Sequence, residues 1–228
     1  MISLLCPTRG RPDNMRRFAY SAIEHAEQPV EIVFYIDDDD QASSDALRAM
    51  APLLLPNPVW GTGGPRVRLA ETWNACADLA SGDVLGHLGD DVVFHTPGWD
   101  RLVTDAFAEF EDRIAFVYGR DGVHDERLGT HGFVHRRWVD TIGYLTPPYF
   151  AHDYCDTWLN EVAGMIGRRR FLPDVSLEHL HPDVQKAPMD DTYREHIEAG
   201  RRDNVAALYA SLAHERRADA EKLRAVML

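Results

Sequence analysis

The sequence predicts an α/β fold in which helices cover a mostly parallel central sheet. Along the N-terminal half, short apolar runs typical of buried strands alternate with segments that have the apolar spacing of helices. Turn residues and polar clusters follow the apolar runs directly. This alternation is typical of a parallel sheet, because a crossover must connect each strand to a parallel neighbour.

Short apolar runs mark the expected strands. Residues 2–6 end at Pro7, and residues 30–36 end at a run of aspartates that starts with Asp37. Both runs have strand length and stop at residues that break strands. The other expected strands are residues 67–69, 84–88, 92–94, 114–118, 131–135, 171–172 and 176–180.

Amphipathic spacing marks the expected helices. Asp13 is expected to cap the first, because Met15, Phe18 and Ala22 then share one face. Residues 56–65 are rich in proline and glycine and are expected to form a loop. The other expected helices are residues 45–55, 70–80, 99–110, 136–142, 154–166 and most of 190–223.

We expect one domain with a helical extension. Residues 1–187 contain every expected strand, and residues 188–228 are expected to form a C-terminal helical extension packed on the outside of the same domain. The length of 228 residues fits this organisation. The sequence has neither an internal repeat nor a low-complexity linker.

Composition and charge restrict the class of protein. The net charge of −13 disfavours a surface built to hold nucleic acid by charge. No apolar run approaches the ~18 residues of a membrane span, and the N-terminus lacks the basic leader of a signal peptide. Three cysteines without metal-like spacing fit buried free thiols. We therefore expect a cytoplasmic protein with no membrane span.

Polar side chains follow several expected strands at the point where each strand ends. Thr8 and Arg9 follow the first strand, Asp37 follows the second, and Asp90 and Asp91 follow a later one. Ligands of parallel α/β sheets bind beyond the carboxyl ends of the strands. The sequence therefore predicts a ligand site at this edge.

Carboxylates and histidines suggest a metal site there. Adjacent carboxylates such as Asp90 and Asp91 suit Mg²⁺ or Mn²⁺, which prefer oxygen ligands, although Gly-Asp-Asp is also a good turn sequence. His179 and His181 point the same way if their segment is extended, and could complete the site. The alternative is that these histidines are structural.

Two further acids, Asp153 and Asp156, lie at the start of an expected helix and one turn apart. Asp153 could be a general base that takes the proton from a weakly nucleophilic hydroxyl, with Asp156 as its partner or substitute. The alternative is that Asp153 caps the helix. Asn74 lies on another expected helix, where it is either a solvent-facing polar residue or a brace for a nucleotide loop.

These motifs, in their order, resemble the family 2 glycosyltransferases and related GT-A enzymes, which use nucleotide-diphosphate sugars. The resemblance spans residues 2–182, and the family that it indicates includes phage-type members. It is carried by residues 4–12 (Leu-Leu-Cys-Pro-Thr-Arg-Gly-Arg-Pro), 32–38, 70–88, 132–133, 152–158 and 178–182 (Glu-His-Leu-His-Pro).

The resemblance implies a GT-A Rossmann-like fold and an inverting, metal-dependent transfer of a sugar to an acceptor hydroxyl. The implied donor is a nucleotide-diphosphate sugar, with a UDP-sugar the first choice, and the implied cofactor is Mn²⁺ or Mg²⁺. Asp153, with Asp156 beside it, would be the catalytic base. The implied donor-nucleotide residues are Pro7, Thr8, Arg9, Asp37, Asn74 and Asp90, and the implied metal ligands are Asp91, His179 and His181.

Two departures from the family pattern stand out. The metal motif is usually Asp-x-Asp, whereas this chain has Gly89-Asp90-Asp91 and lacks the first acid. His152 stands where an acid often precedes the base.

Three alternatives remain at the sequence level. A nucleotidyltransferase would need a glycine-rich phosphate loop, which the sequence lacks after its first strand. A non-catalytic module that binds nucleotide sugars would fit the missing first acid. The third alternative is a glycosyltransferase that acts on modified bases of DNA, which would make nucleic acid a partner only as the acceptor.

Overall fold

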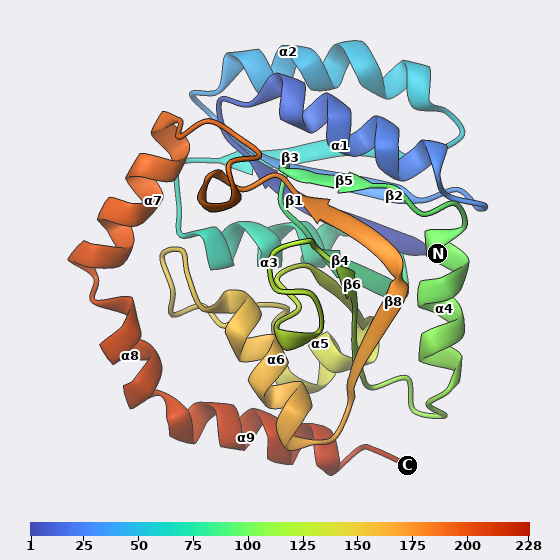
Figure 1. The fold of residues 1–228 in the computed structure, drawn as a ribbon, viewed down its shortest axis with the longest axis vertical. Coiled ribbons are helices and arrows are strands. Elements are labelled where there is room, and N and C mark those ends of the chain that lie inside the picture. The colour runs from blue at the N-terminus through green and yellow to red at the C-terminus, as the bar shows by residue number, and fades with distance from the viewer.

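The computed structural model describes residues 1–195 and 197–228, and it shows a twisted sheet with helices on both faces (Figure 1). Its strands are β1 (Ile2–Thr8), β2 (Glu31–Asp37), β3 (Val59–Gly64), β4 (Val84–His87), β5 (Val92–Phe94), β6 (Phe116–Arg120), β7 (Gly132–His135) and β8 (Arg169–His179).

Within the described residues these eight strands form one sheet, in the order β3-β2-β1-β4-β7-β6-β8-β5. The pairs β3–β2, β2–β1, β1–β4 and β6–β8 are parallel, whereas β7 and β5 run antiparallel to their neighbours. The predicted α/β class with a mostly parallel sheet is therefore confirmed.

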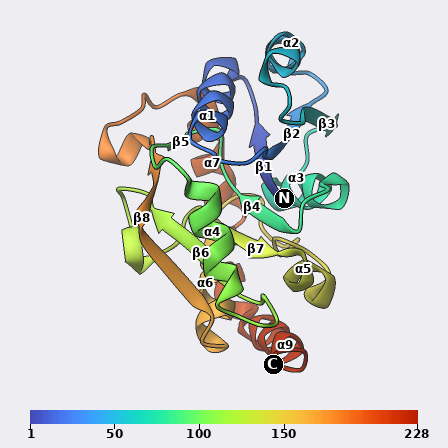
Figure 2. The same cartoon turned by 90° about the vertical axis from the view of Figure 1, so that its right-hand side faces the viewer.

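Helices cover the two faces of the sheet (Figure 2). Leu4 and Leu5 of β1 point to opposite faces, as successive strand residues must, and each lies in a separate hydrophobic cluster. On the Leu4 side pack α1 (Pro12–Glu24), α2 (Gln41–Met50) and α4 (Trp99–Ala108). On the Leu5 side pack α3 (Leu69–Leu79), α5 (Arg136–Ile142), α6 (Cys155–Met165) and α9 (Ala213–Arg224).

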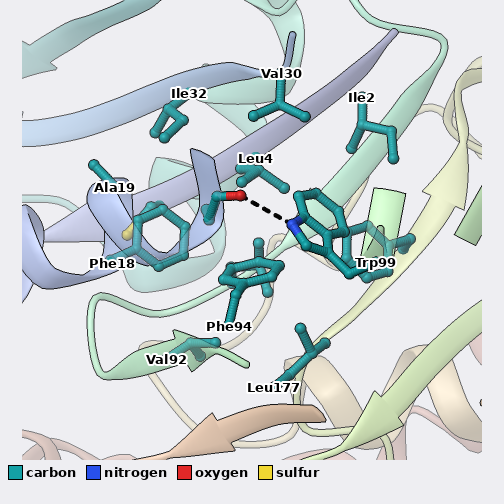
Figure 3. Close-up of a cluster of buried hydrophobic side chains, with 14 of the residues drawn as sticks. Ile2, Leu4, Phe18, Ala19, Val30, Ile32, Val92, Phe94, Trp99 and Leu177 are labelled. Atoms are coloured by element: carbon teal, nitrogen blue, oxygen red, sulfur yellow. Dashed lines mark hydrogen bonds between the residues drawn. The ribbon is translucent and has the colours of Figure 1, made fainter. Parts of the chain in front are cut away.

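Trp99 forms the centre of the cluster on the Leu4 side (Figure 3). Its side chain is fully buried, and its ring lies 4.5 Å from that of Phe94. The indole N–H donates to the carbonyl oxygen of Ala22 on α1 at 2.9 Å. The first residue of α4 is thereby tied to α1, and the one polar atom of the indole is satisfied.

The segment 56–65 corrects the sequence-based expectation of a loop. It contains β3, the edge strand that pairs in parallel with β2. Its glycines, which suggested a loop, permit close packing: a Cβ at Gly63 would lie 2.3 Å from the carbonyl oxygen of Ile36. The strand expected at residues 67–69 is absent from the described residues, because Val67 and Arg68 form a loop and Leu69 begins α3.

Three element boundaries also differ from expectation. Helix α1 begins at Pro12 after an N-cap at Arg11, so Asp13 lies in the first turn. Helix α2 begins earlier than expected because Asp40 caps it, and it gives way to a 3-10 helix at Ala51–Leu54, where Pro52 cannot donate a backbone hydrogen bond. The strands expected at 171–172 and 176–180 are one strand, β8, whose register with β6 shifts between them.

The C-terminal segment forms α7 (Asp191–Arg202), α8 (Val205–Ser211) and α9, and runs along one side of the molecule in Figure 1, from α7 near the top to α9 at the bottom. Helix α9 packs against α5 and α6. Its buried Asp219 accepts hydrogen bonds from Trp158 at 3.1 Å and from Tyr144. Among the described residues, no helix is both long and apolar enough to cross a membrane.

Glu31 joins the parallel half of the sheet at the end opposite the predicted site. Its buried carboxylate accepts hydrogen bonds from Ser3 (2.5 Å), Trp60 (3.1 Å), and the amide and hydroxyl of Ser81 (2.7 and 3.0 Å). Burial acts to raise the pKa of Glu31, but these bonds outweigh it and hold the pKa below its ordinary value.

We expect Glu31→Gln to lower the free energy of unfolding by about 1.5–3 kcal/mol at neutral pH, because bonds to a charged acceptor are lost. A depressed carboxyl pKa stabilises the fold above the unfolded value of about 4.5, and this stabilisation is lost as pH falls through the folded pKa. The gap between wild type and variant, measured by urea unfolding, should therefore shrink below that pH. Glu24→Gln, at an exposed position of α1, is the control. A gap that does not change with pH would contradict this role.

Candidate functional site

The carboxyl ends of β1, β2 and β4 lie together at one edge of the sheet, because these strands are parallel neighbours. Two adjoining cavities of about 670 and 660 Å³ open over this edge. We call the first the arginine cavity, after its lining residues Arg9, Arg66, Arg68 and Arg202. We call the second the histidine cavity, after His87, His124, His131, His152, His179 and His181.

The two cavities are parts of one cleft. Pro7, Leu69, His152 and Thr192 line both of them. Thr8, Arg9 and Asp37 line the arginine cavity, and Asp90, Asp91, Asp153, Asp156, His179 and His181 line the histidine cavity. The structure therefore brings together every site residue predicted from the sequence except Asn74.

The arginine cavity presents charges of both signs. Arg9 donates to Asp37 at 2.7 Å and to Asp39 at 2.9 Å. Burial raises the pKa of Asp37, although Arg9 counteracts it. Arginine forks suit phosphate oxygens, and a carboxylate at the end of β2 can accept from the N–H and O–H groups of a nucleoside. The cavity thus offers complementary groups to both halves of a nucleotide.

Asp90 connects the turn after β1 to the end of β4. The hydroxyl of Thr8 donates to it at 2.7 Å, and Arg11 lies 3.3 Å from its other oxygen. Burial and the neighbouring charge of Asp91 raise the pKa of Asp90 above the usual carboxyl range.

Asp91, His131 and His179 form a group that could hold a metal ion. One ligand atom from each lies within 4.8 Å of the others, and all three side chains are buried. Neither ring nitrogen of His131 has a hydrogen-bond partner among the described residues. Burial lowers the pKa of His131 to about 3, which leaves the ring neutral with a lone pair available. Two imidazoles and a carboxylate are a common ligand set for a transition metal.

Burial acts to raise the pKa of Asp91, but its partners outweigh that effect and hold the pKa far below the usual range. The largest of these effects comes from His179, whose Nε2 lies 3.4 Å from Asp91 Oδ2. The hydroxyl of Tyr193 donates to the same oxygen at 2.5 Å. Asp91 is therefore ionised and ready to bind a cation.

Gly89 accounts for the acid missing from the expected motif. A Cβ at this position would lie 2.7 Å from Asp91 Oδ1 and 3.4 Å from His131 Cε1. The space that a longer side chain would occupy is thus filled by two members of the metal-capable group. His131, the residue before β7, thus places an imidazole beside the position where the Asp-x-Asp pattern has its first acid.

His181 lines the same cavity but lies outside the group of three. Its ring is 4.9 Å from the ring of His179 and 5.2 Å from that of Tyr193. Its Nδ1 accepts from the backbone N–H of Asp183 at 3.2 Å, and strand β8 ends before it, at His179.

The two candidate bases face the histidine cavity from the start of α6. Asp153 has a side chain that is 55% exposed, and its carboxylate lies 3.0 Å from Nδ1 of His152. Tyr154, and not Asp153, is the N-cap of α6, and it makes no capping hydrogen bond through its side chain. Asp156 accepts from the N–H of Thr157 at 2.6 Å, and burial raises its pKa.

Asn74 serves a different segment. Its amide oxygen accepts from the backbone N–H groups of Leu145 and Thr146 at 2.9 and 3.0 Å, and its amide nitrogen donates to the Thr146 carbonyl at 2.8 Å. It braces the loop after α5 and does not belong to the lining of either cavity.

Sequence reasoning missed three residues of this site: Arg11, His131 and Tyr193. His131 is far from Asp91 in sequence and reaches it because β7 pairs with β4, with His87 opposite Gly132. Only Arg11 carried a signal, since it lies in the arginine-rich opening motif.

Comparisons with known proteins concern the fold of the chain. Neither a protein-family model nor a curated protein sequence matches the chain. Among solved structures, the mannosyltransferase PcManGT from Pyrobaculum calidifontis, in complex with GDP-Man and Mn²⁺, is similar with a TM-score of 0.67 and 13% identity over 99% of this chain and 73% of that one.

The Staphylococcus aureus protein TarS is similar with a TM-score of 0.61 and 11% identity, over 77% of this chain and 36% of its own. TarS residues 1–349 in complex with UDP-GlcNAc give a TM-score of 0.57 and 13% identity, with 57% of that chain covered. This chain thus spans only part of TarS. At such low identities the likeness shows the fold, which is that of the GT-A-type glycosyltransferases.

We expect His131→Ala to weaken Mn²⁺ binding more than ~10-fold, since even partners of metal ligands are worth about that much. His181→Ala, in the same cavity, is expected to change the affinity much less. Calorimetric titration of each variant with Mn²⁺ measures the difference. If His181→Ala has the larger effect, the ligands are those predicted from the sequence, and His131 is structural.

Proposed function

We propose that this chain is a glycosyltransferase that binds a nucleoside diphosphate sugar together with a divalent cation and transfers the sugar to an acceptor hydroxyl. The observation that carries the proposal is the position of the Asp91–His131–His179 group. It lies in one cleft with the arginine cavity and with two acids, Asp153 and Asp156. Such a transfer needs a nucleotide site, a counter-charge for the diphosphate, and a base.

The donor would lie along the cleft. The arginine cavity would take the nucleoside and diphosphate, with Asp37 on the nucleoside and guanidinium groups on phosphate oxygens. The sugar would then extend past Asp90 into the histidine cavity. The similar structures hold GDP-Man, UDP or UDP-GlcNAc, which supports a nucleotide-sugar donor here, with a UDP-sugar as the first candidate.

Asp91, His131 and His179 would hold the cation. When bound, the cation would neutralise the negative charge that develops on the leaving diphosphate. Two imidazoles beside one carboxylate favour Mn²⁺ over Mg²⁺, because Mg²⁺ prefers oxygen ligands. The Mn²⁺ in the mannosyltransferase complex supports the same choice.

Asp153 would act as the base. Its exposed carboxylate lines the histidine cavity, where an acceptor hydroxyl can approach it, and His152 lies beside it. Removal of the proton from the acceptor would let its oxygen attack the anomeric carbon from the side opposite the diphosphate, which inverts the configuration. Asp156 is the second candidate, because it lines the same cavity and burial raises its pKa above the ordinary carboxyl value.

We expect UDP or GDP to bind well only with a divalent cation, and Asp91→Asn to remove this dependence, since it removes the one charged ligand. Calorimetry with Mn²⁺, with Mg²⁺ and in EDTA measures it. Asp183→Asn is the matched control, because Asp183 is an exposed acid that lines the same cavity. Equal nucleotide affinity in EDTA and in Mn²⁺ would remove the cation from the mechanism.

We expect Asp153→Asn to lower kcat by ~10²–10⁴-fold, the usual contribution of a general base, with donor affinity nearly unchanged. Asp156→Asn should have the smaller effect. The rate of donor turnover, measured with an acceptor found by screening, gives kcat, and calorimetry gives the affinity for the donor. A larger loss of kcat in Asp156→Asn would identify Asp156 as the base, and normal turnover in both variants would show that neither acid is the base.

A further inference from the structure

We propose that Tyr193 is a positioning residue for the cation site, and that the C-terminal extension orients the metal ligand Asp91 through Tyr193. This inference rests on the proposed site at Asp91, His131 and His179. Its basis is the 2.5 Å hydrogen bond from the Tyr193 hydroxyl to Asp91 Oδ2, across 102 residues of sequence.

The two oxygens of Asp91 have different surroundings. Oδ2 receives the Tyr193 hydroxyl and lies 3.4 Å from Nε2 of His179. Oδ1 lies on the side of Gly89 and His131. A carboxylate held at one oxygen cannot rotate freely, so the hydroxyl fixes the plane in which Asp91 meets both histidines. Partners of this kind set the orientation of metal ligands in proteins.

Tyr193 is itself held firmly in place. It is 9% exposed, and its ring centroid lies 4.1 Å from the guanidinium carbon of Arg11. Arg11 also makes two hydrogen bonds of 2.7 Å with Asp190, whose carboxylate caps α7 by accepting from the N–H of Tyr193 at 2.9 Å. Arg11 also contacts Asp90. The contacts therefore run without a break from Asp90 through Arg11, Asp190 and Tyr193 to Asp91.

This series of contacts couples the cation site to the position of α7. Any contact that favours the cation through Asp91 must, by reciprocity, be strengthened when the cation binds. Helix α7 also forms one wall of the arginine cavity, through Glu195, Glu198, Ala199 and Arg202. The cation would therefore stabilise the wall against which the donor nucleotide binds.

The test is Tyr193→Phe, which removes one hydroxyl and keeps the ring. We expect it to weaken Mn²⁺ binding by ~10–100-fold, the usual effect of losing a partner of a metal ligand. Tyr144→Phe is the matched control, because Tyr144 also donates to a buried aspartate, Asp219, yet lines neither cavity. Its Mn²⁺ affinity should equal that of the wild type.

Hydrogen exchange of α7 provides the second readout, which a merely structural tyrosine would not change. Mn²⁺ should slow exchange in α7 of the wild type and of Tyr144→Phe, but much less in Tyr193→Phe. Should Tyr193→Phe not fold, Asp190→Asn replaces it: asparagine keeps the cap, weakens the pair with Arg11, and should also lower Mn²⁺ affinity.

Wild-type Mn²⁺ affinity in Tyr193→Phe, or in Asp190→Asn where that variant is used, would overturn the inference and leave the proposed function intact. A wild-type protein that binds no Mn²⁺, with or without nucleotide, would instead overturn the cation site, and the positioning role with it.

Discussion

Asp90 and Asp91 are adjacent, and both carboxylates are buried at the end of β4. A buried charge costs several kcal/mol unless partners compensate it, so the surrounding elements must supply these partners. Arg11 from the turn before α1 reaches Asp90, while His179 from β8 and Tyr193 from α7 reach Asp91. Elements from both ends of the chain therefore converge on this pair.

The burial of Asp90 and Asp91 also explains why position 89 is a glycine and not the first acid of the Asp-x-Asp pattern. A third carboxylate beside this pair would add repulsion in a region of low dielectric, where like charges interact strongly. Gly89 leaves that space to Asp91 and to the neutral imidazole of His131, the residue before β7. The proposed cation site would thereby have a third ligand without a third negative charge, which suits cations that accept imidazole.

The C-terminal extension belongs to this site and does more than cover the outside of the domain. Asp190 and Tyr193 contact the residues around the carboxylate pair, and five further residues of α7 line the arginine cavity. Helices α8 and α9 anchor the segment at its other end, where Asp219 accepts from Trp158. The likeness to the mannosyltransferase covers 99% of this chain and so includes this extension, whereas the likeness to TarS covers 77%.

Local signals in the sequence predict the α/β class and the edge of the sheet over which the two cavities open, because alternating periodicity and strand-end polar residues can be recognised within short segments. It misread β3 as a loop, since glycines that pack closely resemble glycines that turn. The tertiary structure alone decided that His131 joins Asp91 and that Tyr193 holds it, because strand order and the path of α7 set these contacts. Contacts between segments that are distant in the chain produce no characteristic residue spacing, so they cannot be recognised from one sequence.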